Sequence, residues 1–211
     1  MNWATKYALE NMAEDSRVDA VYLSDGSVQI TIEDQPPVLT VFHPGMEVTE
    51  EIAERYFRAY PKLDFLCGYK RACFWHGDAI VFLSEHNIGW GTMGTLTSAM
   101  QTGEANTASS KIYKFASDAL QTMGGLKVER LADRIFQITG RKESLRVFLL
   151  FEYQPAVEHV RSIIENHPDT QLICLIDPNV RPTQSAINHA EVSGVQMFEL
   201  GEAMSFIRRQ C

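Results

Sequence analysis

The sequence lacks the features that would assign it to several familiar protein classes. No apolar run approaches the roughly 20 residues that a helix needs to span a bilayer, so no membrane contact is predicted. The four cysteines form no C-x-x-C pair, and the six histidines show neither H-E-x-x-H nor i, i+4 spacing, so no metal site is predicted. Lys and Arg number 19 against 27 Asp and Glu, a formal net charge of -8, which disfavours binding nucleic acid by bulk neutralisation of phosphates.

What the chain does contain is typical of a globular protein. With 45% hydrophobic, 22% charged and 10% aromatic residues, it can bury a core without disulfides or metals. Residues 1–17 are amphipathic and acidic, without the basic start and apolar stretch of a signal peptide. Cys67 and Cys174 fall inside apolar runs, as reduced, buried thiols do. We therefore expect a cytoplasmic protein.

An internal repeat is the strongest signal in the sequence. Residues 48–100 align without a gap on residues 155–207 at a constant offset of 107, and upstream of this stretch the offset is 108. Any two α/β segments share some apolar periodicity, but a gapless register of this length favours a duplication. The identical pairs in the gapless stretch are Glu51 and Glu158, Pro61 and Pro168, Cys67 and Cys174, Ala79 and Ala186, Ile80 and Ile187, Gly94 and Gly201, and Ser98 and Ser205.

Each half shows the same succession of patterns. An amphipathic helix comes first, followed by three short strands, a helix, a buried strand, a second helix, a short strand and a closing helix. The order α-β-β-β-α-β-α-β-α predicts an α/β fold with a mixed sheet and helices on both faces. We therefore predict two tandem repeats, residues 1–105 and 109–211, related by a pseudo-two-fold axis and joined by a linker at 106–110.

This order resembles the core of the restriction-endonuclease-like, or PD-(D/E)XK-type, superfamily, whose αβββαβ centre is often extended by another α-β-α. The closing stretch 185–207 also looks like the tail of such proteins. The resemblance is one of fold, and a shared fold does not carry an activity with it. Family members that cut DNA place an acidic residue at the second strand and an E-x-K pair on the third, where the carboxylates hold a divalent metal.

The sequence departs from that catalytic pattern. The third strand of the first repeat, Val38 to His43, contains neither a carboxylate nor a lysine. In the second repeat Asp133 precedes the second strand and Glu152 ends the third, so these two are the candidate catalytic residues. They would need Mg²⁺ and would have to converge on one ion at about 2.0 to 2.6 Å; the alternative is that both face solvent. We expect that both repeats have lost catalytic activity and that the protein has no cofactor.

One loop of the first repeat combines basic and aromatic residues directly after a buried strand, where α/β proteins usually place ligands. Lys70 and Arg71 are candidates for contacting phosphates, with Tyr69 or Trp75 stacking on a ring. The matching loop of the second repeat keeps one basic residue, Arg181. The alternative is that the aromatic side chains cover the core or the contact between the repeats.

These patterns lead to three functional hypotheses. The leading one is a non-enzymatic interaction or adaptor protein on a degenerate nuclease-like fold, which binds a protein partner or contacts nucleic acid locally. The alternatives are a metal-dependent nuclease acting through the second repeat and a small-ligand-binding protein. Because fused repeats normally reproduce the contact of an ancestral homodimer, we expect a monomer with an internal pseudo-dimer, or a homodimer.

Overall fold

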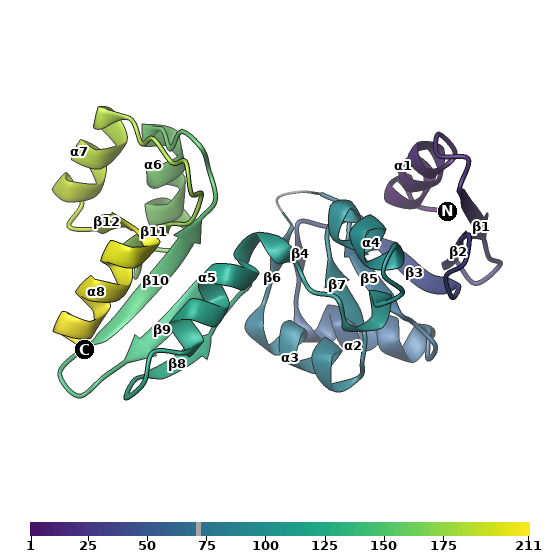
Figure 1. Ribbon diagram of the computed structural model, residues 1–211, viewed down its shortest axis with the longest axis horizontal. Coiled ribbons are helices and arrows are strands. Elements are labelled where there is room, and N and C mark those ends of the chain that lie inside the picture. The colour runs from purple at the N-terminus through teal and green to yellow at the C-terminus, as the bar shows by residue number, and fades with distance from the viewer. Residues whose placement is uncertain (71–72) are drawn as a thin grey trace. The chain divides into compact units, whose positions relative to one another are not determined.

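A five-stranded mixed sheet forms the centre of each of two units in the computed structural model, which describes residues 1–70 and 73–211 (Figure 1). Unit 1 is Met1–Lys111 and unit 2 is Ile112–Cys211. Helices accompany both sheets, which confirms the predicted α/β class with mixed sheets. Among the described residues, no helix combines the length and the apolar character needed to cross a membrane.

In unit 1 the sheet order is β1-β2-β3-β5-β7, antiparallel between the first three strands and parallel thereafter. A separate parallel pair, β4 and β6, was not predicted from the sequence. The elements are α1 (Trp3–Met12), β1 (Val18–Tyr22), β2 (Val28–Ile32), β3 (Val38–His43), β4 (Glu47–Val48), α2 (Glu50–Ala59), β5 (Phe65–Gly68), β6 (Phe74–Trp75), α3 (Gly77–Glu85), β7 (Gly89–Gly91), α4 (Met93–Met100) and the 3-10 helix η1 (Ala105–Thr107).

Helices cover both faces of the unit 1 sheet. On one face α1 and α4 pack against the strands, with Leu96 in the same cluster as Phe65. On the other face α2 and α3 pack, with Leu83 in the same cluster as Leu66. Since successive residues of a strand point to opposite faces, the continuous apolar run of β5 supplies both cores, as its pattern predicts.

In unit 2 the five strands lie in the order β8-β9-β10-β11-β12. Its first three strands are also antiparallel and the last two pairings parallel. Helices α5 and α8 pack on one face, and α6 and α7 lie together on the other (Figure 1). The elements are α5 (Lys111–Gln121), β8 (Lys127–Arg130), β9 (Ile135–Thr139), β10 (Ser144–Leu150), α6 (Val157–Asn166), β11 (Leu172–Leu175), α7 (Gln184–Val192), β12 (Gln196–Glu199) and α8 (Leu200–Gln210).

The register of strand pairing follows the two offsets found in the sequence. In the parallel part, Thr40 pairs with Phe65 in unit 1 and Val147 pairs with Leu172 in unit 2, so both strands are shifted by 107. In the antiparallel hairpins the shift is 108. The hairpin pairs are Asp19 with Thr31 and Lys127 with Thr139.

One hydrogen bond outside the two five-stranded sheets also occurs in both units. The amide of Phe74 donates to the carbonyl of Met46 at 2.8 Å, and the amide of Arg181 donates to the carbonyl of Tyr153 at 2.7 Å, again 107 residues further on. In unit 1 this bond lies at the β4–β6 pair, whereas in unit 2 it joins two segments outside the strands.

The segment predicted as a linker, residues 106–110, lies within unit 1. The amide of Trp90 donates to the carbonyl of Ala108 at 2.9 Å, so the segment is bonded to β7. Ala105 approaches β7 so closely that a Cβ on Gly89 would lie 1.9 Å from its carbonyl oxygen. Glycine at position 89 is thus required by this approach. The division between the units falls after Lys111.

Candidate functional site

An aromatic and cationic surface lies where β5 of unit 1 ends. Tyr69 and Lys70 follow β5 directly, and α1 places Trp3 beside them. The rings of Trp3 and Tyr69 meet edge to face with centroids 5.4 Å apart, and Nζ of Lys70 lies 5.8 Å from the centroid of the Trp3 ring. Tyr7 continues the cluster, 6.3 Å from Trp3. We call Trp3, Tyr7, Tyr69 and Lys70 the aromatic surface.

Helix α1 supplies half of this surface because of its residue spacing. Trp3, Tyr7 and Asn11 are four residues apart and therefore share one face of the helix. Nδ2 of Asn11 donates to the hydroxyl of Tyr69 at 3.1 Å, which ties the helix to the loop after β5. The buried face of the same helix carries Ala8.

The start of α1 is anchored to the sheet. The side-chain oxygen of Asn2 accepts from the amide of Thr5 at 2.9 Å and so caps the helix. Its Nδ2 donates to the carbonyl of Phe42, near the end of β3, at 3.2 Å. This capping residue therefore holds Trp3 at the carboxyl edge of the parallel strands, the edge where α/β proteins place ligands.

The aromatic surface is open to solvent. Trp3 is 44% exposed and Tyr7 54% exposed. Sequence reasoning identified Tyr69 and Lys70 but missed the two residues of α1. The available signal was the spacing of two aromatic residues on the polar side of an amphipathic helix. Such a surface can pack against an apolar or planar group while Lys70 meets an anion.

Other residues expected to bind a ligand lie elsewhere. Trp75 is 1% exposed, and its ring centroid lies 5.1 Å from that of Trp90 in the core, so it offers no face for stacking. This placement corresponds to the alternative in which Trp75 covers the core. Arg71 lies outside the described residues. Arg181 is exposed and belongs to unit 2.

The candidate catalytic carboxylates occupy different environments. Asp133 is 2% exposed, and its two carboxylate oxygens accept from Nε and NH2 of Arg134 at 2.9 and 2.7 Å. The guanidinium of Arg134 also lies over the ring of Tyr113, 5.1 Å from its centroid. Glu152 is half-buried, just after β10. Both oxygens of Asp133 are thus engaged with a cation of the chain itself, and the described residues contain no group of three or more His, Cys, Asp or Glu suited to a metal ion.

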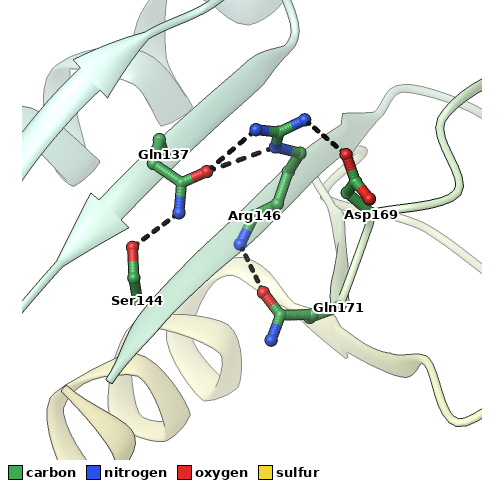
Figure 2. A network of polar contacts seen from close by, with 5 residues as sticks. All are labelled: Gln137, Ser144, Arg146, Asp169 and Gln171. Carbon is green, nitrogen blue, oxygen red and sulfur yellow. Dashed lines mark hydrogen bonds and ion pairs between the residues drawn. The ribbon is translucent and has the colours of Figure 1, made fainter. Parts of the chain in front are cut away.

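A polar network on β9 and β10 has a structural role (Figure 2). Nε and NH2 of Arg146 both donate to Oε1 of Gln137, each at 3.2 Å, and NH1 donates to Asp169 at 3.1 Å. The amide of Arg146 also donates to Oε1 of Gln171 at 3.0 Å, and Gln137 donates to Ser144 at 2.6 Å. These residues lie where β10 and β11 begin, the edge opposite the one that usually binds ligands. The network joins β9 and β10 to the segment that leads into β11.

The cysteines are not placed as nucleophiles. Cys67 and Cys174 are buried in β5 and β11, and Cys73 is 2% exposed. Burial raises the pKa of Cys174 to about 12 and that of Cys67 further still. Cys211 is partly exposed, and burial raises its pKa as well. Since the thiolate is the reactive form, none of these shifts activates a thiol.

We predict that thiol labelling will separate Cys211 from the buried cysteines. With 5,5′-dithiobis(2-nitrobenzoate) at pH 8, Cys211 is expected to react first because reagent can reach it, and the three buried thiols only as the protein unfolds. Release of thionitrobenzoate with time measures this. Cys211→Ser should remove the early phase, and early labelling of that variant would show that a thiol described as buried is open.

No protein-family model, curated protein or solved structure matches the chain.

Proposed function

We propose that this chain is a non-enzymatic interaction protein that binds a protein partner through the aromatic surface of unit 1. The observation that carries the proposal is that Trp3 and Tyr7 are exposed to solvent and that Lys70 lies beside Trp3. Both aromatic residues are on α1, which is anchored to the carboxyl edge of the sheet. Tryptophan and tyrosine are the residues that most often dominate the binding energy of protein interfaces. Lys70 adds a charge next to them.

The charge of unit 1 supports a protein partner rather than nucleic acid. Residues 1–111 contain eight Lys and Arg against fifteen Asp and Glu. This balance repels phosphates at long range, although Lys70 supplies one local positive charge. The partner that fits offers an apolar side chain to Trp3 and Tyr7 and a carboxylate to Lys70.

We further propose that the two units are tandem copies of one ancestral unit. Their common strand order, their common register under offsets of 108 and 107, and one further hydrogen bond found in both units support this. Under these offsets, unit 2 keeps only one aromatic residue at the positions that correspond to the aromatic surface. Its positions there hold Lys111, Phe115, Ile176 and Asp177.

The nuclease-like ancestry remains part of the proposal. The order α-β-β-β-α-β, extended by α-β-α, occurs in each unit and is the order that suggested the resemblance. Engagement of Asp133 by Arg134 supports a degenerate site, because the guanidinium already neutralises the buried carboxylate and places a positive charge where a metal ion would have to sit. The Mg²⁺-dependent nuclease is therefore the less favoured alternative.

Affinity purification with matched variants tests the protein-binding proposal. Proteins that co-purify with the tagged wild-type chain should be lost with the double variant Trp3→Ala, Tyr7→Ala. Truncating a hot-spot residue costs about 2 kcal/mol or more, which weakens Kd about 30-fold. The matched control is Phe115→Ala, at the position of unit 2 that corresponds to Tyr7. Phe115 is 77% exposed, so this variant also removes an exposed aromatic ring.

Titration of a purified partner then decides the outcome. An unchanged Kd for the double variant, or equal loss with Phe115→Ala, would refute the aromatic surface as the binding site. Recovery of no partner by the wild type would count against the interaction role. Quenching of Trp3 by single-stranded oligonucleotides would instead identify nucleic acid as the ligand.

A further inference from the structure

Unit 1 contains a cavity of about 260 Å³ at the end of α1, between this helix, the strands β1 and β2, and α4. Its wall is mostly apolar, and a few polar residues, among them Asp15, Arg17 and Thr97, lie at its rim. Cavities that bind small molecules are typically lined in this way. The apolar wall is formed by Met12, Val18, Ile32, Met93 and Met100.

The fold itself does not require this cavity, as unit 2 shows. At the positions that correspond to Asp15 and Thr97, unit 2 has Met123 and Met204, and both pack in its hydrophobic core. The position of Ile32 corresponds to Gly140, where Cys211 approaches so closely that an added Cβ would meet its carbonyl oxygen at 2.3 Å. In unit 2, methionines and the C-terminal residue thus occupy space that unit 1 leaves open.

The volume limits what the cavity can hold. An apolar protein cavity of about 150 Å³ accommodates benzene, so about 260 Å³ suits a bicyclic ring or an aliphatic group of similar size. Three methionines in the wall, Met12, Met93 and Met100, have flexible and polarisable side chains that adapt to a flat ring.

The rim indicates the charge and polarity of the occupant. Nε and NH2 of Arg17 donate to the carboxylate of Asp15 at 3.0 and 2.7 Å. This hydrogen bond lowers the pKa of Asp15 to about 2, so the pair stays ionised near neutral pH and carries no net charge. A neutral ligand therefore suits the rim better than an ion does. The guanidinium has five N–H donors, and those not directed at Asp15 can bond to a ligand oxygen.

We propose that this cavity is a binding site for a small neutral molecule with an apolar body of bicyclic size and one hydrogen-bonding group directed at Arg17. The site lies apart from the loop of Trp75, where sequence reasoning expected a small ligand. It involves none of the four residues of the aromatic surface. The small-molecule site can therefore be tested independently of the proposed protein-binding surface.

Methyl NMR of the full chain tests the proposal with 2-naphthol as the probe. In protein labelled with [¹³C-methyl]methionine, titration should shift the resonances of Met12, Met93 and Met100 saturably. Those of Met123 and Met204, at filled positions of unit 2, should stay in place. Absence of saturable shifts up to the solubility limit of 2-naphthol, or equal shifts in both groups, would overturn the proposal.

Blocking variants locate the probe. Thr97→Phe places a ring at the rim and should weaken binding at least tenfold, whereas Ser162→Phe, on an exposed position of α6, should leave the affinity unchanged. The unshifted resonances of Met123 and Met204 report that unit 2 is intact, and circular dichroism reports the fold of the whole chain. If Thr97→Phe unfolds unit 1, Gln101→Trp, at the same rim, replaces it. Unchanged affinity in a folded blocking variant would refute the site.

Discussion

Replacing Trp75 by alanine is expected to lower the free energy of unfolding of unit 1 by about 3–5 kcal/mol. Trp75 is 1% exposed and packs against Trp90 in the cluster between the sheet, α2 and α3. Removing its ring would forfeit this burial and leave a cavity that the surrounding strands and helices fill only in part. Urea unfolding followed by tryptophan fluorescence measures the effect, because all three tryptophans of the chain lie in unit 1.

The control for this prediction is Trp3→Ala. Since Trp3 is 44% exposed and lies on a surface, its loss is expected to cost less than about 1 kcal/mol of stability. The two variants therefore separate a tryptophan that stabilises the fold from one that is available for binding. A small effect of Trp75→Ala, comparable to that of Trp3→Ala, would restore the ligand-binding interpretation of the Trp75 loop.

Replacing Asp133 by alanine is expected to destabilise unit 2 by a similar amount, about 3–5 kcal/mol. Asp133 is 2% exposed, and Arg134, whose side chain is 16% exposed, would lose its bidentate carboxylate partner while remaining largely buried. The free-energy cost of leaving the Arg134 charge unpaired exceeds the net contribution of the intact ion pair to stability. Much of that cost is the desolvation of a buried guanidinium that no longer has its carboxylate partner. Urea unfolding followed by far-ultraviolet circular dichroism measures this, with the transition of unit 2 analysed separately.

An exposed ion pair of unit 2 provides the control. Glu129→Ala removes the partner of Lys127, and both side chains are more than half exposed, so an effect below about 0.5 kcal/mol is expected. A plasmid-nicking assay with Mg²⁺ adds a functional readout, in which the wild type is expected to be inactive. Nicking by the wild type that disappears in a folded Asp133→Ala or Glu152→Ala variant would establish the nuclease alternative.

Some functional expectations depend on contacts that the sequence does not display. The sequence placed Asp133 before the second strand of unit 2, as a metal ligand would be. It did not reveal the two hydrogen bonds that Asp133 accepts from Arg134. It grouped Trp75 with Lys70 and Tyr69 in one loop, although Trp75 faces the core. Adjacent residues in a chain share a neighbourhood, but the direction of each side chain depends on what packs above and below it.

The sequence by itself determined the α/β class and the order of the main helices and strands, although not the β4 and β6 pair. These features could be predicted because they depend on local periodicity, turn residues and helix ends, and each of these signals involves only a few consecutive residues.

Only the tertiary structure decided which of these elements carry candidate sites. It brought α1 to the end of β5, so that Trp3 meets Lys70 across more than sixty residues of chain, and it left a cavity between α1, β1, β2 and α4. Such features depend on distances between side chains of separate elements. Those distances arise when the helices pack on the sheet, and no short stretch of sequence encodes them.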